Sequence, residues 1–364
     1  MNEFQAKQQY IQELLEKHRL DALLLQRVSS FAWATCGGRS FVNTAVTGGE
    51  ASLLITTSRR YVLTNNIEAR RIEEEEGLGG QGWEFRVSPW YDPGNAVEEL
   101  AGRLKLGADG PYPGALDLSN EIAQLRSQLG PEEGERFRDL GQLCAQAMDR
   151  AIRRLQPGQT EQESAAILDY ETQSRGVQPV VVLSATDGRI FSRRHPLPTG
   201  RKMERYAMLV LCGRRSGLVA SITRLVHFGR LPDELVKKQA ACAQVDAAMI
   251  AATRPGRRLG EVFARAQDEY AAVGFPDEWK LHHQGGPAAY EPREWVATPS
   301  SATTVHSGQA YAWNPSIAGC KSEDTILVGP GSNSVLTNVE GWPALPVTLP
   351  DGQTLPRPAI LEIV

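Results

Sequence analysis

The sequence predicts a two-domain protein, with a small α/β domain first and a larger domain of two similar halves after it. At roughly 150 residues per domain, a chain of 364 residues is long enough for two domains. Helix and strand patterns alternate over the first third, as is typical of an α/β domain. Later, a helix, a Pro-Gly step and a second helix occur twice, which indicates two related halves.

Apolar spacing predicts the elements of the first domain. Over residues 3–18, Phe4, Ile11, Leu14 and Leu15 share one helical face. Further helices are expected over 67–76, 95–104 and 120–129, and strands over 21–25, 31–35, 51–56, 61–64, 85–88 and 114–118. Pro, Gly and charged residues interrupt both periodicities at 130–134, which is therefore the predicted linker.

The second domain opens with a long amphipathic helix that ends at Pro157-Gly158. Thr160 and Glu163 then predict a capping box, in which each side chain satisfies a free amide at the start of the next helix. Four residues recur 98 positions later: Pro157, Gly158, Glu163 and Gly176 match Pro255, Gly256, Glu261 and Gly274. Two similar halves that face each other would enclose a cleft, which is a natural place for a site.

Composition excludes several classes of partner. The chain has 39 basic and 43 acidic residues and a net charge of −4, without a stripe of Lys and Arg. We therefore expect no nucleic-acid partner and no binding to an anionic membrane. No apolar run approaches the roughly 18 residues that cross a bilayer, and the N-terminus lacks the apolar core of a signal peptide. The expected location is cytoplasmic.

The five cysteines, Cys36, Cys144, Cys212, Cys242 and Cys320, are widely spaced and form no CxxC pair. This spacing predicts neither a disulfide framework nor a structural zinc site. Free cysteines of this kind are usually small buried hydrophobic residues. Cys212 could be a nucleophile, but the sequence identifies no base beside it.

Six short motifs follow one another along the second domain. They are LQPGQTEQE at 155–163, HPLPT at 195–199, SITR at 221–224, LHHQGG at 281–286, AWNP at 312–315 and KSEDT at 321–325. Their order and spacing resemble those of the creatinase, prolidase, Xaa-Pro aminopeptidase and methionine aminopeptidase family. The resemblance implies a creatinase-type α/β domain over residues 1–133. It implies an α+β pita-bread domain with pseudo-twofold halves over residues 136–364.

Active peptidases of that family hold two divalent metals with two Asp, one His and two Glu. The resemblance places Val210, Ser221, Gly286, Asn314 and Glu323 at these five positions. Hard divalent ions need charged oxygen ligands, and only Glu323 supplies one. We therefore expect a divergent member with no dinuclear site, no metal ligands and no cofactor.

His195, His282 and Glu323 are the candidate catalytic residues. The resemblance implies that both histidines lie in the active site without ligating metal, and that creatinase, which needs no metal, relies on the histidine that His195 resembles. An imidazole titrates near pH 6.5, so it can move a proton at cellular pH without a cofactor. His282 and His283 are adjacent, and on a strand only one of them would face the cleft. The motif position favours His282.

Basic and polar residues near the former metal positions are candidates for ligand binding. An arginine in a cleft without metal charge could hold a carboxylate in a bidentate fork. The expected ligand is a small amino-acid or peptide-like molecule. The candidates are Arg224, Thr223, Arg293, Lys321 and Asn314. The alternative for each basic residue is a structural ion pair, with Glu323 paired to a neighbouring arginine.

Three functions remain open at this point. The first is a binding protein without metal-dependent catalysis. The second is a metal-independent, creatinase-like C–N hydrolase in which His195 is the general acid and base, assisted by His282 and Glu323. The third is an atypical Xaa-Pro aminopeptidase or dipeptidase. The resemblance also implies a homodimer.

Overall fold

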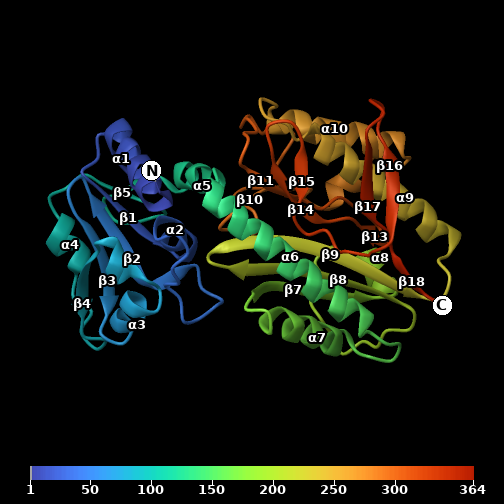
Figure 1. Ribbon diagram of the computed structural model, residues 1–364, viewed down its shortest axis with the longest axis horizontal. Helices are drawn as coiled ribbons and strands as arrows, with labels where there is room; N and C mark the ends of the chain where they lie inside the picture. Colours follow the sequence, from blue (N-terminus) through green and yellow to red (C-terminus); the bar gives the residue numbers. More distant parts are fainter. Residues whose placement is uncertain (1) are drawn as a thin grey trace. The chain divides into compact units, whose positions relative to one another are not determined.

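The computed structural model describes residues 2–364, which form two compact units (Figure 1). The first ends at Ser127 and includes Ser216–Leu218, and the second comprises Gln128–Arg215 and Val219–Val364. The predicted linker at 130–134 is not a linker but the start of helix α6 (Pro131–Arg153), with Gly130 as its N-cap. Proline is well placed in the first helical turn, because the amide that it lacks would have no partner there.

The first unit is an α/β domain, as predicted. Its six-stranded mixed sheet has the order β4-β3-β2-β1-β5-β6. The strands are β1 (Ala22–Arg27), β2 (Gly48–Thr56), β3 (Arg60–Asn65), β4 (Glu84–Ser88), β5 (Leu106–Ala108) and β6 (Leu116–Asp117). The helices are α1 (Glu3–His18), α2 (Val28–Ala34), α3 (Ala69–Glu74), η1 (Leu78–Gln81), α4 (Ala96–Ala101) and α5 (Ser119–Ser127).

One element of this unit was predicted wrongly. The expected strand at 31–35 is the end of helix α2, all of whose residues are buried. A short segment that is buried on every side shows neither the helical nor the strand period, so its apolar pattern cannot distinguish the two.

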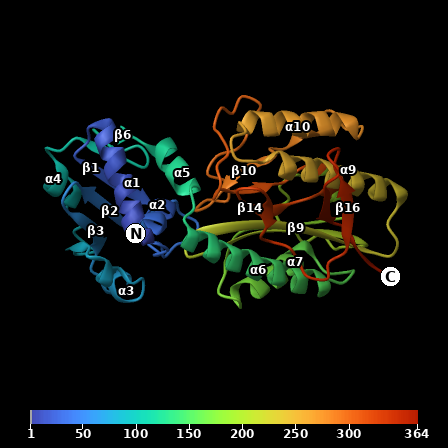
Figure 2. The same cartoon turned by 45° about the horizontal axis from the view of Figure 1, so that its top comes forward.

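The second unit stacks two sheets between two pairs of helices. Figures 1 and 2 show α6 and α7 (Glu161–Gln173) on one side and α9 (Asp233–Ala252) and α10 (Leu259–Ala272) on the other. One sheet has the order β18-β9-β8-β7, and the other has the order β10-β11-β14-β15. The first contains β7 (Gln178–Thr186), β8 (Tyr206–Arg215), β9 (Leu218–Phe228) and β18 (Leu361–Ile363). The second contains β10 (Gly285–Ala288), β11 (Ala310–Trp313), β14 (Asp324–Val328) and β15 (Asn333–Val335).

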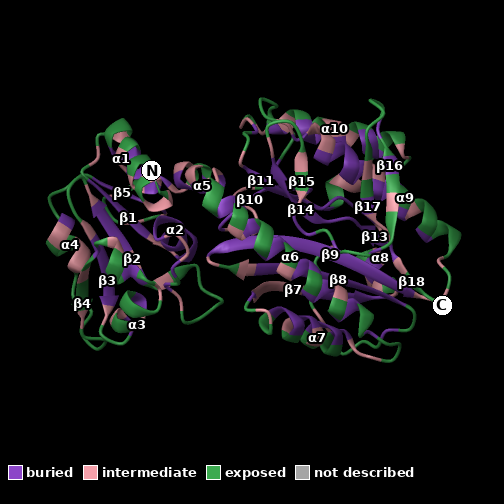
Figure 3. Cartoon of the chain, in the orientation of Figure 1, coloured by how far each residue is buried: buried purple, intermediate pink, exposed green. Residues whose placement is uncertain are grey.

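Short elements complete this unit. They are α8 (Gly188–Ser192), η2 (Glu278–Leu281) and the paired strands β12 (Ser316–Ile317) with β13 (Cys320–Lys321) and β16 (Ala344–Thr348) with β17 (Thr354–Pro358). Strands β8 and β9 are buried along almost their whole length (Figure 3). Val210 on β8 and Trp313 on β11 belong to the same core cluster.

Equivalent glycine turns after the paired helices support the prediction that this unit has two similar halves. Gly158 and Gly256, which follow α6 and α9, have φ of 93° and 87°. Gly176 and Gly274, which follow α7 and α10, have φ of 70° and 88°. Only glycine adopts these left-handed angles without steric cost, so the same residue is required at both places. The capping box of Thr160 at the start of α7 is also present as predicted.

The five cysteines are free, and all but the half-buried Cys36 are buried, as predicted. Among the described residues 2–364, none of the helices is both long enough and apolar enough to span a bilayer.

Candidate functional site

Three histidine rings lie together in the second unit; we call His195, His282 and His283 the histidine cluster. His195 follows α8, and the other two lie between η2 and β10. The Nε2 atoms of His195 and His282 are 3.0 Å apart. The His283 ring centroid lies 5.5 Å from that of His195 and 4.4 Å from that of His282.

The expectation that only one of His282 and His283 would face the site is wrong, because both rings lie beside His195. Alternation to opposite faces holds only within a regular strand. Strand β10 begins two residues later, at Gly285, whose φ of 105° interrupts the extended conformation. His283 is thus a site residue that the strand argument missed.

The environment holds this cluster in the neutral form. Burial, together with the positive charge of Lys321, lowers the pKa of His282 to about 2. Burial and the charge of Arg293 lower the pKa of His283 to about 4, and partial desolvation of the largely exposed His195 side chain also lowers its pKa. The Nδ1 atoms of His282 and His283 are buried and have no hydrogen-bond partner. The cluster therefore presents uncharged imidazoles with unused polar atoms.

Glu323 immediately precedes β14, and its backbone bridges to Thr223 of β9. Its carboxylate is 2% exposed and is surrounded by donors. The Lys321 ammonium lies 2.7 Å from Oε2, the Arg293 guanidinium lies 2.9 Å from Oε1, and Thr223 Oγ1 donates at 2.5 Å. Burial alone would raise the pKa of Glu323, but the charges of Lys321 and Arg293 outweigh it and lower that pKa to about 2. Glu323 therefore stays ionised.

Glu323 was expected to assist His195, but among residues 2–364 no hydrogen bond or ion pair joins Glu323 to the histidine cluster. The carboxylate is instead paired with basic residues, which was the structural alternative for this position.

Asn314 and Ser221 border Glu323. Trp313 pairs with Asp324 across β11 and β14, so the next step of this register places Asn314 opposite Glu323. The Asn314 Oδ1 atom is buried without a partner. Ser221 Oγ accepts a hydrogen bond of 3.0 Å from Arg293. The Cys212 thiol lies 3.3 Å from Ser221 Oγ, and burial raises its pKa, which makes it a poor nucleophile.

The Arg224 side chain does not join the Glu323 carboxylate, although it was grouped with it as a ligand-binding candidate; of Thr223 and Glu323 it contacts only the backbone oxygens, at 2.8 and 3.3 Å. It follows Thr223 on β9, and successive side chains of a strand point to opposite faces. Its guanidinium pairs with Asp324 at 2.9 Å, and Asp324 also pairs with Arg357 at 2.6 Å. Arg357 in turn pairs with Asp246 at 2.7 Å.

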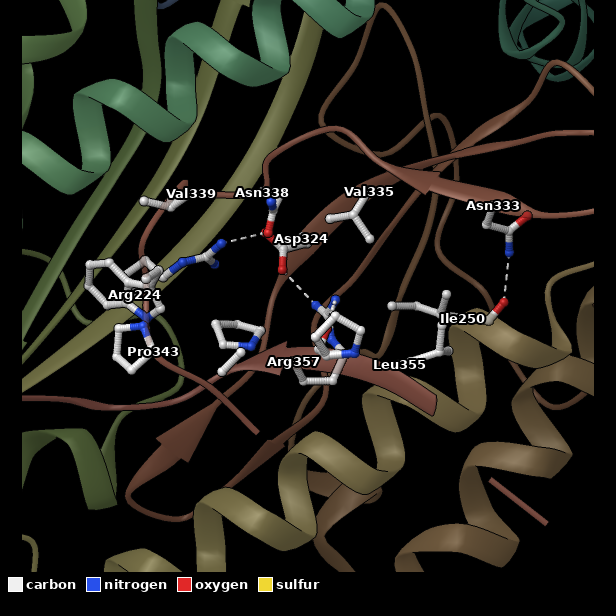
Figure 4. Close-up of a pocket in the computed structure, with 14 residues that line it drawn as sticks. Arg224, Ile250, Asp324, Asn333, Val335, Asn338, Val339, Pro343, Leu355 and Arg357 are labelled. Carbon is white, nitrogen blue, oxygen red and sulfur yellow. Dashed lines mark hydrogen bonds and ion pairs between the residues drawn. The ribbon is translucent and has the colours of Figure 1, made fainter. Parts of the chain in front are cut away.

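This buried arginine–aspartate network, made of Arg224, Asp246, Asp324 and Arg357, borders a separate pocket. Figure 4 shows Arg224, Asp324 and Arg357 around this cavity of about 250 Å³. Neither Glu323 nor any member of the histidine cluster lines it. The alternation of residues on β9 was the signal that could have placed Arg224 here.

Glu161 also supports the site, although it was not among the residues predicted from the sequence. It is fully buried at the start of α7, where its carboxylate accepts hydrogen bonds from Thr186 N at 2.9 Å and from Thr199 N at 3.0 Å. It also forms an ion pair with Arg189. Thr186 and Thr199 stand on either side of the segment that carries His195. Glu161 therefore acts as a positioning residue that anchors this segment at both ends.

Comparisons with known proteins agree with this architecture. Residues 135–330 match the family model of metallopeptidase family M24. An uncharacterized peptidase of Staphylococcus haemolyticus is 24% identical over 232 residues. That match spans 62% of this chain and 66% of the relative, which is just under two thirds of its length.

Solved structures share the fold over nearly the whole chain. The prolidase of Pyrococcus horikoshii OT3 superposes with a TM-score of 0.78 at 19% identity, covering 92% of this chain and 99% of that one. The Xaa-Pro dipeptidase of Bacillus anthracis superposes with a TM-score of 0.77 at 17% identity, covering 99% and 100%. These likenesses establish the prolidase type of fold, with an N-terminal domain before the M24 domain.

Proposed function

The chain belongs to metallopeptidase family M24, and we propose that it is a member without the two-metal centre, which binds a small amino-acid or peptide-like ligand. The observation that carries this proposal is the pairing of Glu323. Its carboxylate holds an ammonium group and a guanidinium group, from Lys321 and Arg293, and so has no negative charge left for two metal ions.

The other four ligand positions support the same conclusion. Val210 is packed in the apolar core, and Ser221 and Asn314 are neutral. At Gly286 a side chain would not fit, because an added Cβ would lie 2.2 Å from the backbone oxygen of Trp295. Two dications need several anionic oxygen ligands to balance their charge. The residues present do not fit a dinuclear centre.

The unpartnered polar atoms around Glu323 support an amino-acid or peptide-like ligand. Asn314 Oδ1, an acceptor, and Arg293 Nε, a donor, are both buried without a partner. Buried polar atoms left unpaired cost free energy, which a ligand carrying both an N–H donor and a carboxylate would recover. A zwitterion has both groups.

The first prediction concerns metal and peptidase activity. After equilibrium dialysis against Mn²⁺, we expect mass spectrometry to find no pair of Mn²⁺ ions on the chain, because the oxygen ligands are missing. We expect no Mn²⁺-dependent cleavage of the dipeptide Gly-Pro. Two Mn²⁺ ions per chain together with cleavage would overturn the proposal and establish the atypical Xaa-Pro peptidase.

A metal-independent C–N hydrolase is the second candidate function. The contact of 3.0 Å between the Nε2 atoms of His195 and His282 favours it, because the neutral His282 ring can accept a hydrogen bond from the imidazolium that His195 becomes when it takes a proton from the substrate. His195 is exposed, so a substrate could reach it. The lack of a bond between Glu323 and either histidine removes one of the helpers that the sequence analysis assigned.

The second prediction tests this candidate. In a screen of small C–N substrates under EDTA, His195→Ala is expected to abolish any turnover found. Its free energy of unfolding should change by less than about 0.5 kcal/mol, because the side chain is exposed. The matched control is His306→Ala, another exposed histidine, which should keep full turnover. Turnover that survives in His195→Ala would exclude His195 from the mechanism.

The homodimer and the cytoplasmic location stay predictions.

A further inference from the structure

We propose that the histidine cluster binds one late transition-metal ion such as Zn²⁺. Its three imidazole groups lie at other residues than the five metal-ligand positions of the family, and they are nitrogen ligands, whereas the family uses mainly carboxylates. His195, His282 and His283 each offer one nitrogen, and these nitrogens all lie within 4.8 Å of one another. No member of the cluster stands at a position that the family resemblance assigns to a metal ligand. This inference rests on the histidines alone and does not depend on the amino-acid-like ligand.

The spacing is close to that of a bound ion. With Zn–N bonds of about 2.0–2.1 Å, tetrahedral geometry places two ligating nitrogens about 3.3 Å apart. The Nε2 atoms of His195 and His282, at 3.0 Å, are already near this separation. Rotation of the side chains would bring the third nitrogen inward by about 1–2 Å. No rearrangement of the backbone is required by these distances.

The second observation is the unused hydrogen-bonding capacity of the cluster. His282 is 9% exposed, and its Nδ1 atom has no partner; the Nδ1 atom of His283 is also buried and unpartnered. A neutral imidazole has one N–H and one lone pair, and the lone pair is the group that binds a metal. When the Nε2 atom of His282 binds the ion, the unpartnered Nδ1 atom of that ring carries its N–H. An ion would replace the single contact between His195 and His282 with three nitrogen ligands.

The ligand type selects the ion. A set of three imidazoles favours Zn²⁺, Cu²⁺ and Ni²⁺ over Mg²⁺, Ca²⁺ and Mn²⁺, which prefer oxygen. Glu323 is bound to Lys321 and Arg293, so these three groups carry a net charge of about +1 beside the cluster. This charge opposes a dication and favours an anion as its fourth ligand. The exposed side of His195 leaves such a position open to solvent.

The third prediction is tested with the untagged full-length chain, stripped with EDTA and dialysed against Zn²⁺ or, as a spectroscopic probe, Co²⁺. We expect one ion per chain by elemental analysis and a Co²⁺ spectrum of nitrogen-rich tetrahedral coordination. His195→Ala, at an exposed position, and His283→Ala should each weaken Zn²⁺ binding more than about tenfold. His306→Ala should bind as the unmodified chain does. Lys321→Gln should bind about tenfold more tightly, because it removes one opposing charge.

The outcomes separate this inference from the proposed function. Absence of bound Zn²⁺, or one Zn²⁺ that both histidine variants retain, would overturn the three-histidine site and leave the amino-acid-like ligand unaffected. Two Mn²⁺ ions with dipeptide cleavage would overturn the proposed function whatever the Zn²⁺ result. One Zn²⁺ that is lost in both variants, without an Mn²⁺ pair, supports both proposals.

Discussion

Glu323→Gln is expected to lower the free energy of unfolding by about 3–5 kcal/mol, because it leaves two buried cations without their shared counter-charge. Lys321 and Arg293 are both close to the carboxylate, at 2.7 and 2.9 Å, and neither has another carboxylate partner among residues 2–364. Breaking one side of a buried ion pair costs more than the pair itself contributes. Urea denaturation followed by circular dichroism measures the difference.

Two further variants test whether the loss of stability comes from the unpaired cations. Glu340→Gln, at an exposed glutamate in the same unit, should change the free energy of unfolding by less than about 0.5 kcal/mol. Adding Lys321→Met to Glu323→Gln should restore part of the loss, because only one buried cation then remains unpaired. A loss below about 1 kcal/mol in the single variant would show that Glu323 does not hold these cations in solution.

The Glu323 carboxylate also makes the free energy of unfolding depend on pH. Its pKa is about 2 in the folded protein and 4.5 ordinarily, so on acidification the unfolded chain takes up the proton first. This contribution to stability is complete above pH 4.5 and is lost as the pH falls toward 2. The lowered pKa values of His282 and His283 act in the same direction from pH 6.5 downward. As the pH is lowered below 4.5, the melting temperature of Glu323→Gln should therefore fall less steeply than that of the unmodified chain. Parallel plots of melting temperature against pH for the two proteins would contradict the lowered pKa of Glu323.

Asp324→Asn is expected to have a similarly large effect, a loss of about 3–5 kcal/mol. Arg224 and Arg357 are each 2% exposed, and both bind this carboxylate. Thr337 Oγ1 also donates to Asp324, at 2.7 Å. The amide replaces one carboxylate oxygen by a donor, which cannot accept from a guanidinium.

The measurement is again urea denaturation, with Asp268→Asn as the control at an exposed aspartate of the same unit. The control should stay within about 0.5 kcal/mol of the unmodified chain. Equal stability of Asp324→Asn and the control would mean that the arginine–aspartate network is not needed for folding.

Long helices with regular apolar spacing, and turns marked by Gly and Pro, were predictable from the sequence. The helix that the repeat predicts before Pro255-Gly256 is α9, Asp233–Ala252, and its Pro-Gly stop is a local signal. Helix α2 was mistaken for a strand because burial on all sides removes the periodic signal. The start of α6 was mistaken for a linker because Gly and Pro also mark helix N-termini.

The site was predictable in its residue types but not in its contacts. Motif order identified Glu323 as a candidate, and its pairing with a neighbouring arginine was foreseen as an alternative. The partners Arg293 and Lys321 come from different segments, and the sequence does not show which of them reaches the carboxylate. His282 and His283 precede β10 and lie outside a regular strand, so the alternation of side chains does not apply to them.

The two-sided arrangement of β9 and β14 has a consequence for how such a protein can diverge. Thr223 and Glu323 lie on the histidine side, whereas their neighbours Arg224 and Asp324 build the arginine–aspartate network on the opposite face. Substitutions at Ser221 and Asn314 therefore alter the surroundings of Glu323 and leave the arginine–aspartate network on the opposite face in place. Adjacent positions in these motifs thus belong to two separate groups of ion pairs, and a substitution in one group can leave the other intact.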